Sequence, residues 1–387
     1  MAEAALLLRG GRVLDPARGL DAPLDVRVRG GQMEAVGAGL DAAGAEVLDV
    51  SGLLVVPGLI DAHVHCFRGL GANSMDPDLL GVTRGVTTVV DAGSSGHSTF
   101  GLFREHVMER ARTRVLAYVN LSTIGSVVNP QYAKLADPRL IDPEGIARVA
   151  AEHRDRVVGM KWMATSSALG PLGLDPLRRG RAIADDTGLP VLVHIGESWG
   201  EGPTQPVEEV VELLHPGDTV THMYTGHRGG LLDANGRLAP AAREARARGV
   251  RFDIGHGANN LSFAVAQRLL DQDFPPDAVS TDGSHLSARG PVYDLPTTMS
   301  KLLGLGLPLA DVLAMATSQA AELIGRADEL GSLAPGRVAD ISVLRLDERD
   351  WTALDSRRDS LTVHQQLVPV FCVRAGEVID PRPPDGP

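Results

Sequence analysis

Residues 55–65 read VVPGLIDAHVH, an apolar run that ends in two histidines separated by one valine. Continuous apolar runs of this length are typical of a strand buried on both faces of a parallel sheet. Because alternate residues of a strand project to the same side, His63 and His65 face the same space. Two imidazoles so placed suit Zn²⁺ or a similar divalent ion. On this segment alone, two polar residues that merely end a strand remain an alternative.

Seven further apolar runs follow, and helical patterns alternate with them. This alternation is typical of βα units, and eight parallel strands are the count of a closed barrel. The expected strands are 53–60, 87–90, 115–120, 157–162, 191–194, 219–222, 250–254 and 278–281. The expected helices include 101–111, 143–154, 175–187, 206–214, 240–248 and 261–272. We therefore predict an α/β fold with a (β/α)₈ TIM-like barrel.

Both ends of the chain carry short apolar runs broken by turn signals, which are typical of small β-sheet units. Neither end has enough strands to form a sandwich alone. We therefore expect one small β-sandwich domain assembled from both termini, residues 1–56 and 331–387. Residues 57–330 are then expected to form the barrel.

Composition excludes several classes of protein. The 387 residues are 43% hydrophobic and 22% charged, which is ordinary for a globular protein. A net charge of −12 argues against a nucleic-acid partner. No apolar run approaches the roughly 20 residues of a membrane span, and the N-terminus lacks a signal pattern. With two cysteines and no disulfide framework, we expect a soluble, cytoplasmic protein without a membrane partner.

Four further residues stand at the ends of predicted strands, namely Lys161, His194, His222 and Asp282. In a (β/α)₈ barrel the carboxyl ends of the strands meet at one mouth, where the reactive residues lie. A single histidine in such a place is more often structural than a ligand. Four histidines at strand ends of one barrel predict a metal site.

Lys161 lies in the apolar stretch VVGMKWM of residues 157–163. A buried ammonium is costly and repels divalent ions, whereas a neutral amine can add CO₂ and become an anionic carbamate. Arginine cannot do this chemistry, and the chain holds only three lysines against 34 arginines. The alternative is a buried lysine paired with Asp282 or Asp253.

Asp282 follows the eighth apolar run in the segment VSTDGSH of residues 279–285. A carboxylate beside a metal ion can ligate it and take a proton from the water it binds. Since Gly283 and Ser284 follow, a helix cap or an Asx-turn is the structural alternative.

The segment 57–65, followed in order by Lys161, His194, His222 and Asp282, resembles the amidohydrolase superfamily. The implied subtype has two metal ions and a carboxylated lysine. The opening stretch 8–15 and the closing stretch 331–340 are similar to the two halves of the β-domain of that superfamily.

Within the superfamily, segments 85–94, 251–257 and 294–301 resemble the amidohydrolase/deacetylase group related to acetyl-mandelate deacetylase. Members of this group are often labelled dihydroorotase. The dihydroorotase pattern places a substrate-binding arginine two residues after the second histidine, where Phe67 stands, and Arg68 comes one residue later. The D-aminoacylase pattern has a bridging cysteine where residues 91–93 read DAG, and adenosine-type deaminases usually lack the bridging lysine.

The resemblance implies two divalent metal ions, expected to be Zn²⁺, and a hydroxide that bridges them and attacks the substrate carbonyl. Asp282 would shuttle the proton to the leaving group. The implied ligands are His63, His65 and Asp282 for the buried ion, His194 and His222 for the outer ion, and carboxylated Lys161 between them.

Three residues are candidates for binding substrate. His256 ends the seventh strand between two glycines, Tyr224 lies two residues after His222, and Arg68 could pair with a carboxylate. Each has a structural or solvent-exposed alternative. His97, His227 and His285 lie on loops near the expected mouth and receive no role.

These observations predict a metal-dependent hydrolase that cleaves an amide or ester bond of a small molecule. The leading substrate class is an N-acyl amino acid or an O-acyl hydroxy acid. One alternative is a cyclic-amide hydrolase of the dihydroorotase or hydantoinase kind, and a more remote one is a non-catalytic scaffold of the same fold. The resemblance also implies a homo-oligomer.

Overall fold

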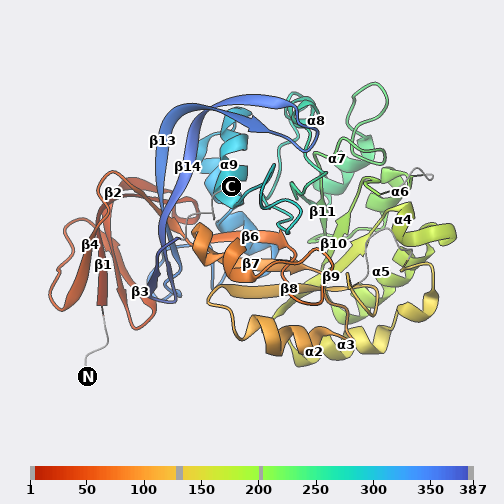
Figure 1. Ribbon diagram of the computed structural model, residues 1–387, viewed down its shortest axis with the longest axis horizontal. Coiled ribbons are helices and arrows are strands. Elements are labelled where there is room, and N and C mark those ends of the chain that lie inside the picture. The colour runs from red at the N-terminus through yellow and green to blue at the C-terminus, as the bar shows by residue number, and fades with distance from the viewer. Residues whose placement is uncertain (1–4, 128–133, 200–203, 382–387) are drawn as a thin grey trace.

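A computed structural model describes residues 5–127, 134–199 and 204–381 of the chain. Figure 1 shows a body of N-terminal strands beside a larger body in which helices surround the barrel strands. Within the described ranges the strands form one sheet of seven and one of eight. No helix of these ranges is long and apolar enough to cross a membrane.

The seven-stranded sheet is parallel and follows chain order from β6 to β12. Its strands are β6 (Leu59–Val64), β7 (Val86–Ala92), β8 (Arg114–Asn120), β9 (Val157–Met163), β10 (Val191–His194), β11 (Thr219–Thr221) and β12 (Arg251–Asp253). Residues 278–283 join its two edges, because Ala278 bridges to Asp253 and Gly283 bridges to Val64. The predicted α/β barrel is therefore confirmed.

Two predicted strands differ in detail. Residues 278–281 form one isolated bridge, at Ala278, instead of a regular strand, and the chain turns sharply at Asp282, where φ is 47°. The run 53–60 is divided, because the Gly58 amide donates to the carbonyl of Asp340 (2.8 Å) and the chain passes there from one sheet to the other. Its first half becomes β5 (Leu54–Pro57) of the eight-stranded sheet and its second half begins β6.

Each predicted helix overlaps one helix of the barrel. The barrel helices are α1 (Pro77–Leu80), α2 (Phe100–Phe103), α3 (Pro143–Glu152), α4 (Ser166–Leu169), α5 (Asp175–Thr187), α6 (Val207–Glu212), α7 (Pro240–Ala247), α8 (Phe263–Leu270), α9 (Leu295–Gly304), α10 (Leu309–Met315) and α11 (Ser318–Leu323). Five of these, α1, α4, α9, α10 and α11, lie outside the predicted ranges. The predicted helix 101–111 is shorter, since a π-helical turn (Arg104–Met108) follows α2.

Strands from both termini share the eight-stranded sheet. They are β1 (Ala5–Asp15), β2 (Leu20–Arg29), β3 (Gln32–Gly37), β4 (Ala45–Asp49), β5, β13 (Ile341–Leu354), β14 (Ser360–Arg374) and β15 (Glu377–Ile379). The strands pair in one continuous mixed sheet, and residues of β1, β2, β3, β5, β13 and β14 share one apolar core.

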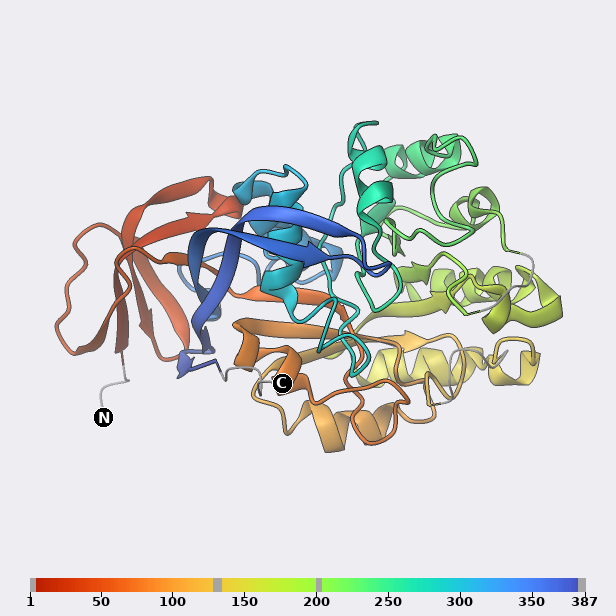
Figure 2. The same cartoon turned by 45° about the horizontal axis from the view of Figure 1, so that its top comes forward.

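The hairpin β13–β14 is much longer than the short apolar runs that the sequence shows near the C-terminus. Its antiparallel ladder runs from Ile341 opposite Val373 to Leu354 opposite Ser360. A search of the sequence for apolar runs misses the outer half of the hairpin, because residues 347–352 are polar or only partly buried. Figure 2 shows this hairpin crossing from the β-domain to the loops at the barrel mouth.

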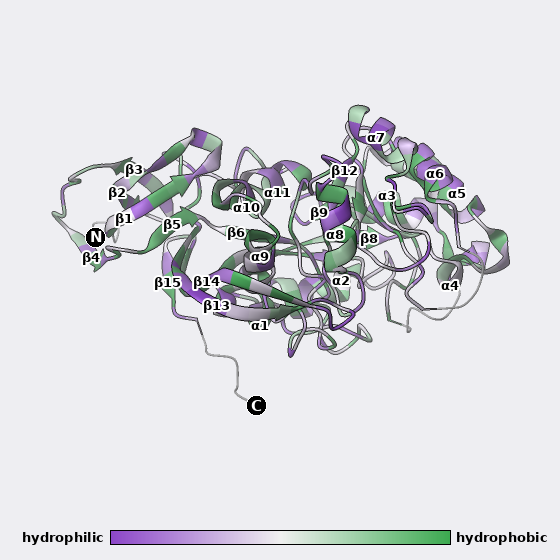
Figure 3. Ribbon diagram, turned by 90° about the horizontal axis from the view of Figure 1, so that it is seen from above, coloured by the Kyte–Doolittle hydropathy of each residue, from purple (hydrophilic) through white to green (hydrophobic). Residues whose placement is uncertain are grey.

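The barrel core forms because each helix turns one apolar face to the sheet. On α5, for example, Leu177, Ile183 and Ala184 are buried, while Arg178 and Asp185 face solvent. Figure 3 shows the same mixture of hydrophilic and hydrophobic residues on the outer helices α6 and α7. This packing holds the strand ends that carry the candidate ligands.

Lys301 connects three parts of the fold near the mouth. This buried side chain of α9 donates from Nζ to the carbonyls of Pro291 (2.6 Å) and Leu354 (2.9 Å). Nζ also lies 2.7 Å from Nε2 of His256. One amine therefore ties the hairpin, the loop after β12 and the loop before α9 together.

Replacing Lys301 with methionine should lower the free energy of unfolding by about 3 kcal/mol, because three buried acceptors lose their donor. Urea denaturation followed by circular dichroism measures the change. Arg268→Met, an exposed cation on α8, is the control and should stay within about 0.5 kcal/mol of wild type. A Lys301→Met protein as stable as this control would contradict the prediction.

Candidate active site and metal centre

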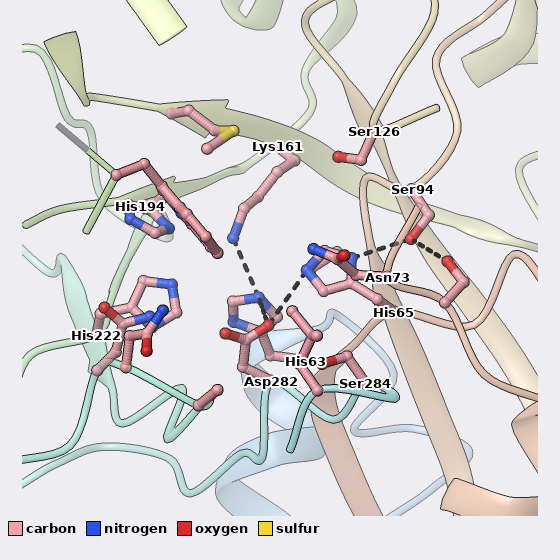
Figure 4. Close-up of a pocket in the computed structure, with 18 of the residues that line it drawn as sticks. His63, His65, Asn73, Ser94, Ser126, Lys161, His194, His222, Asp282 and Ser284 are labelled. Carbon is pink, nitrogen blue, oxygen red and sulfur yellow. Dashed lines mark hydrogen bonds and ion pairs between the residues drawn. The ribbon is translucent and has the colours of Figure 1, made fainter. Parts of the chain in front are cut away.

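A cavity opens at the carboxyl ends of the barrel strands, and all six predicted metal ligands line it. Figure 4 shows their side chains facing one common space. The same wall holds amide, hydroxyl and apolar side chains, among them Asn73, Ser94, Asn120, Ser126, Met163, Trp199, Asn259, Asn260, Ser284 and Leu286. The loops after β6, β7, β8, β10 and β12 supply most of this second group.

His63 lies in β6 and His65 directly follows it, and each has one ring nitrogen in a hydrogen bond and the other facing the cavity. Nδ1 of His63 lies 3.0 Å from Oγ1 of Thr221, and Nδ1 of His65 lies 2.9 Å from Oγ of Ser94. Both Nε2 atoms face a carboxylate oxygen of Asp282, at 3.5 and 3.2 Å. A hydrogen bond at the second nitrogen is what orients a metal-binding histidine.

His194 and His222 are anchored to backbone carbonyls. Nε2 of His194 donates to Gly196 O (3.2 Å), and Nδ1 of His222 donates to Gly255 O (2.6 Å). These bonds place the proton on the engaged nitrogen, so the other nitrogen has a free lone pair. Burial lowers the pKa of His194 to about 3 and the pKa of His222 well below its usual range. Both imidazoles are therefore neutral, as ligands must be.

Lys161 lies on β9 at the centre of this group, with Nζ 3.3 Å from Nε2 of His63. Burial lowers its pKa to about 8, which raises the share of neutral amine. Gly93 makes room for it, because a Cβ there would come within 2.7 Å of the Lys161 Cβ. Among the described residues Lys161 forms no ion pair with Asp253 or Asp282, which weakens the alternative of a paired structural lysine.

Asp282 faces the histidines instead of capping a helix. Ligand atoms of Asp282, His63 and His222 lie within 4.8 Å of one another. Among the described backbone amides none donates to its carboxylate, so the Asx-turn alternative is not favoured. Four imidazoles, one carboxylate and an amine able to form a carbamate fit two divalent ions of the zinc type.

Comparison with known proteins identifies the family. The sequence pattern of the amidohydrolase family matches residues 54–372. The chain belongs to the amidohydrolase family.

Relatives of this amidohydrolase carry several activities in their names. A deacetylase of Agrobacterium fabrum is 37% identical over 357 residues, which cover 92% of this chain and 86% of the relative. Two solved structures match with a TM-score of 0.90 over 98% of this chain and 100% of theirs: a dihydroorotase at 34% identity and an adenine deaminase at 29%. The sequence predicts a hydrolase of amide or ester bonds, and the comparisons confirm a hydrolase acting on carbon–nitrogen bonds.

In this amidohydrolase, two buried carboxylates hold the hydroxyl residues that contact His63 and His65. Asp253 accepts hydrogen bonds from the hydroxyls of Thr221 (2.7 Å) and Ser280 (2.8 Å), and so holds the partner of His63. Asp91 accepts from the Ser94 amide (2.6 Å) and so holds the partner of His65. Burial raises the pKa of Asp253 to about 6.

The three predicted substrate residues do not line the cavity. Arg68 is exposed and pairs with Asp76 (2.7 Å), because the preceding Phe67 turns into the core and directs Arg68 outward. Tyr224 is fully buried, and its hydroxyl has no partner among the described residues. His256 is fully buried against Lys301. These placements correct the sequence-based assignments.

The unassigned histidines are also located. Nε2 of His97 lies 3.3 Å from a carboxylate oxygen of Asp142, His285 is exposed, and His227 donates from Nε2 to Asn259 O (3.0 Å). The amide and hydroxyl residues of the wall were missed by sequence analysis. Their only signal is their place in loops that follow strands.

Proposed function

We propose that this amidohydrolase is a metal-dependent deacylase that cleaves an amide or ester bond of a small molecule. The substrate is an N-acyl amino acid or an O-acyl hydroxy acid. The convergence of four imidazoles, Lys161 and Asp282 on one cavity, with free ligand atoms facing each other, carries the proposal. Cytoplasmic location and assembly as a homo-oligomer remain predictions.

Two Zn²⁺ ions would be held by the predicted ligands. His63, His65 and Asp282 would hold one, His194 and His222 the other, and carboxylated Lys161 would contact both. When bound, such ions supply Lewis acidity and an activated water for attack on a carbonyl.

The protein itself supplies proton transfer and positioning. Asp282 is the catalytic acid–base group: its carboxylate takes the proton of the attacking water and passes it to the departing nitrogen or oxygen. Met163, Trp199 and Leu286 provide an apolar part of the wall, which limits access of bulk water. Asn73, Ser126 and Asn260 offer neutral hydrogen-bonding groups to the remainder of the substrate.

Deacylation is favoured over ring opening by the residue at position 67. Phe67 stands where the dihydroorotase pattern has its arginine, and its ring is buried 4.7 Å from that of Phe103. The described wall of the cavity contains no arginine. The full-length relation to a deacetylase supports the same choice.

One mixed panel tests the proposal. It holds N-acetyl amino acids of both hands, O-acetyl hydroxy acids, cyclic ureides and adenine, followed by proton NMR with zinc-supplemented protein. Release of acetate supports deacylation. Ring opening without acetate would replace this function with a cyclic-amide hydrolase activity. Ammonia release from adenine would replace it with an adenine deaminase activity.

Removing the metal ions should abolish turnover, because in the proposed mechanism only the bound ions activate the water that attacks the carbonyl. Dialysis against a chelator should lower turnover at least about 100-fold, and adding Zn²⁺ should restore it. Protein dialysed without chelator is the control. Unchanged turnover at a measured metal content near zero would refute metal dependence.

A further inference from the structure

The tip of the β13–β14 hairpin lies against the loop that follows β12. Figure 2 shows the tip reaching this loop across the barrel mouth. The side chain of Ser356 bonds to both sides of a short stretch of the loop: its Oγ donates to Gly257 O (3.0 Å) and accepts from the Leu261 amide (3.1 Å). The Ser356 amide also donates to Leu261 O (3.0 Å).

A second tip residue extends this attachment. A carboxylate oxygen of Asp355 accepts from the Phe263 amide at the start of α8 (2.9 Å). The other oxygen of Asp355 accepts from the amides of Arg357 (2.8 Å) and Asp359 (2.9 Å), which fixes the shape of the tip. Asp355 is fully buried, so these bonds form away from water.

The stretch held between these bonds is part of the cavity wall. Residues 258–260 all line the cavity. The stretch also touches the catalytic group, because a Cβ on Gly257, where φ is 55°, would collide with the carboxylate of Asp282. Gly257 is held separately, because its backbone amide donates to Thr281 O (2.9 Å). A shift of residues 258–260 would therefore change the wall that faces the substrate and leave Asp282 in place.

Asn260 is oriented within this stretch. Its Oδ1 accepts a hydrogen bond from Ser198 Oγ (2.8 Å), which leaves the side-chain NH₂ as a donor toward the cavity. The backbone amide of Asn260 donates to His256 O (3.2 Å). The donor suits an acceptor on the substrate, such as a carboxylate or carbonyl oxygen.

We propose that Ser356 and Asp355 of the hairpin tip are positioning residues that hold residues 258–260, so that Asn260 binds an acceptor oxygen on the non-acyl part of the substrate. The C-terminal β-strands thereby contribute to substrate affinity although they supply no residue to the metal centre. The substrate part of this inference rests on the proposed deacylase function, whereas the attachment of the loop does not.

Kinetics test the positioning role. With an N-acetyl amino acid, Ser356→Ala should raise KM about tenfold, the equivalent of roughly two lost hydrogen bonds, and leave kcat within about twofold. Ser356→Thr keeps the hydroxyl and should restore KM. Ser360→Ala, the same change at an exposed position of the hairpin outside these contacts, is the matched control and should behave as wild type.

A double-variant cycle tests whether Ser356 acts through Asn260. Asn260→Ala should raise KM by a similar factor, and the double variant should be no worse than Asn260→Ala alone, because the two changes remove one interaction. The proposal would be overturned if the effects of the two changes on KM multiplied in the double variant. It would also be overturned if KM were unchanged in Ser356→Ala, or if kcat fell by as large a factor as KM rose.

Hydrogen exchange supplies a readout that does not need turnover. Mass spectrometry of peptides covering residues 257–263 should show faster exchange in Ser356→Ala than in Ser360→Ala, with other barrel peptides unchanged. Equal exchange in the two variants would overturn the attachment. A wild-type protein inactive on the whole panel would refute the proposed function, and exchange would still decide whether the tip holds the loop.

Discussion

Lys161→Met should lower kcat/KM about 1,000-fold or more, because loss of a ligand shared by two ions removes several kcal/mol of transition-state stabilisation. Methionine has a similar length and cannot form a carbamate. The variant should also bind fewer metal ions per chain than wild type. Steady-state kinetics and metal analysis by mass spectrometry measure both effects.

Lys161→Arg separates the carbamate from a simple positive charge. Arginine keeps the charge of an unmodified lysine and cannot add CO₂. If the carbamate is required, both variants lose activity and metal to a similar degree. Activity retained in the arginine variant would show that a cation suffices, and full activity in the methionine variant would exclude the carbamate.

Asp282→Asn should lower kcat about 1,000-fold, the range expected when a positioned acid–base group is lost. Asparagine has nearly the same shape as aspartate but takes up no proton. Since Asp282 is also a proposed ligand, metal content must be measured on the same sample. A kcat loss at full metal content assigns the effect to proton transfer.

The matched control for this change is Asp294→Asn. Asp294 caps α9 by accepting from the Thr297 amide (2.8 Å), and asparagine is an equally good cap. This control should keep kcat within about twofold of wild type, because its position is outside the cavity wall. An Asp282→Asn enzyme within tenfold of the control would refute the proposed catalytic role.

The six candidate ligands line one cavity, as the sequence predicts. The convergence of the candidate ligands was predictable because a parallel barrel brings the carboxyl ends of its strands to one mouth. His63, Lys161 and His194 therefore meet even though more than 30 residues separate each from the next. Their residue types also suggested the chemistry, since imidazole and a carbamate-forming amine are metal ligands.

The substrate wall was not predictable in the same way, because loop side chains take directions that local sequence does not specify. Arg68 points outward because Phe67 enters the core, and His256 is turned toward the amine of Lys301. Asn260 in contrast faces the cavity, since Ser198 and the hairpin tip hold its loop.

By itself, the sequence determined the barrel, the participation of both termini in a β-domain and the six candidate ligands of an amidohydrolase. These features depend on the period of apolar residues and on the shared direction of parallel strands, both of which are local or repeated along the chain. Only the tertiary structure decided which neutral residues form the substrate wall and that the β13–β14 hairpin supports it. The physical reason is that these contacts join segments about 100 residues apart, such as Ser356 and Gly257, through single hydrogen bonds.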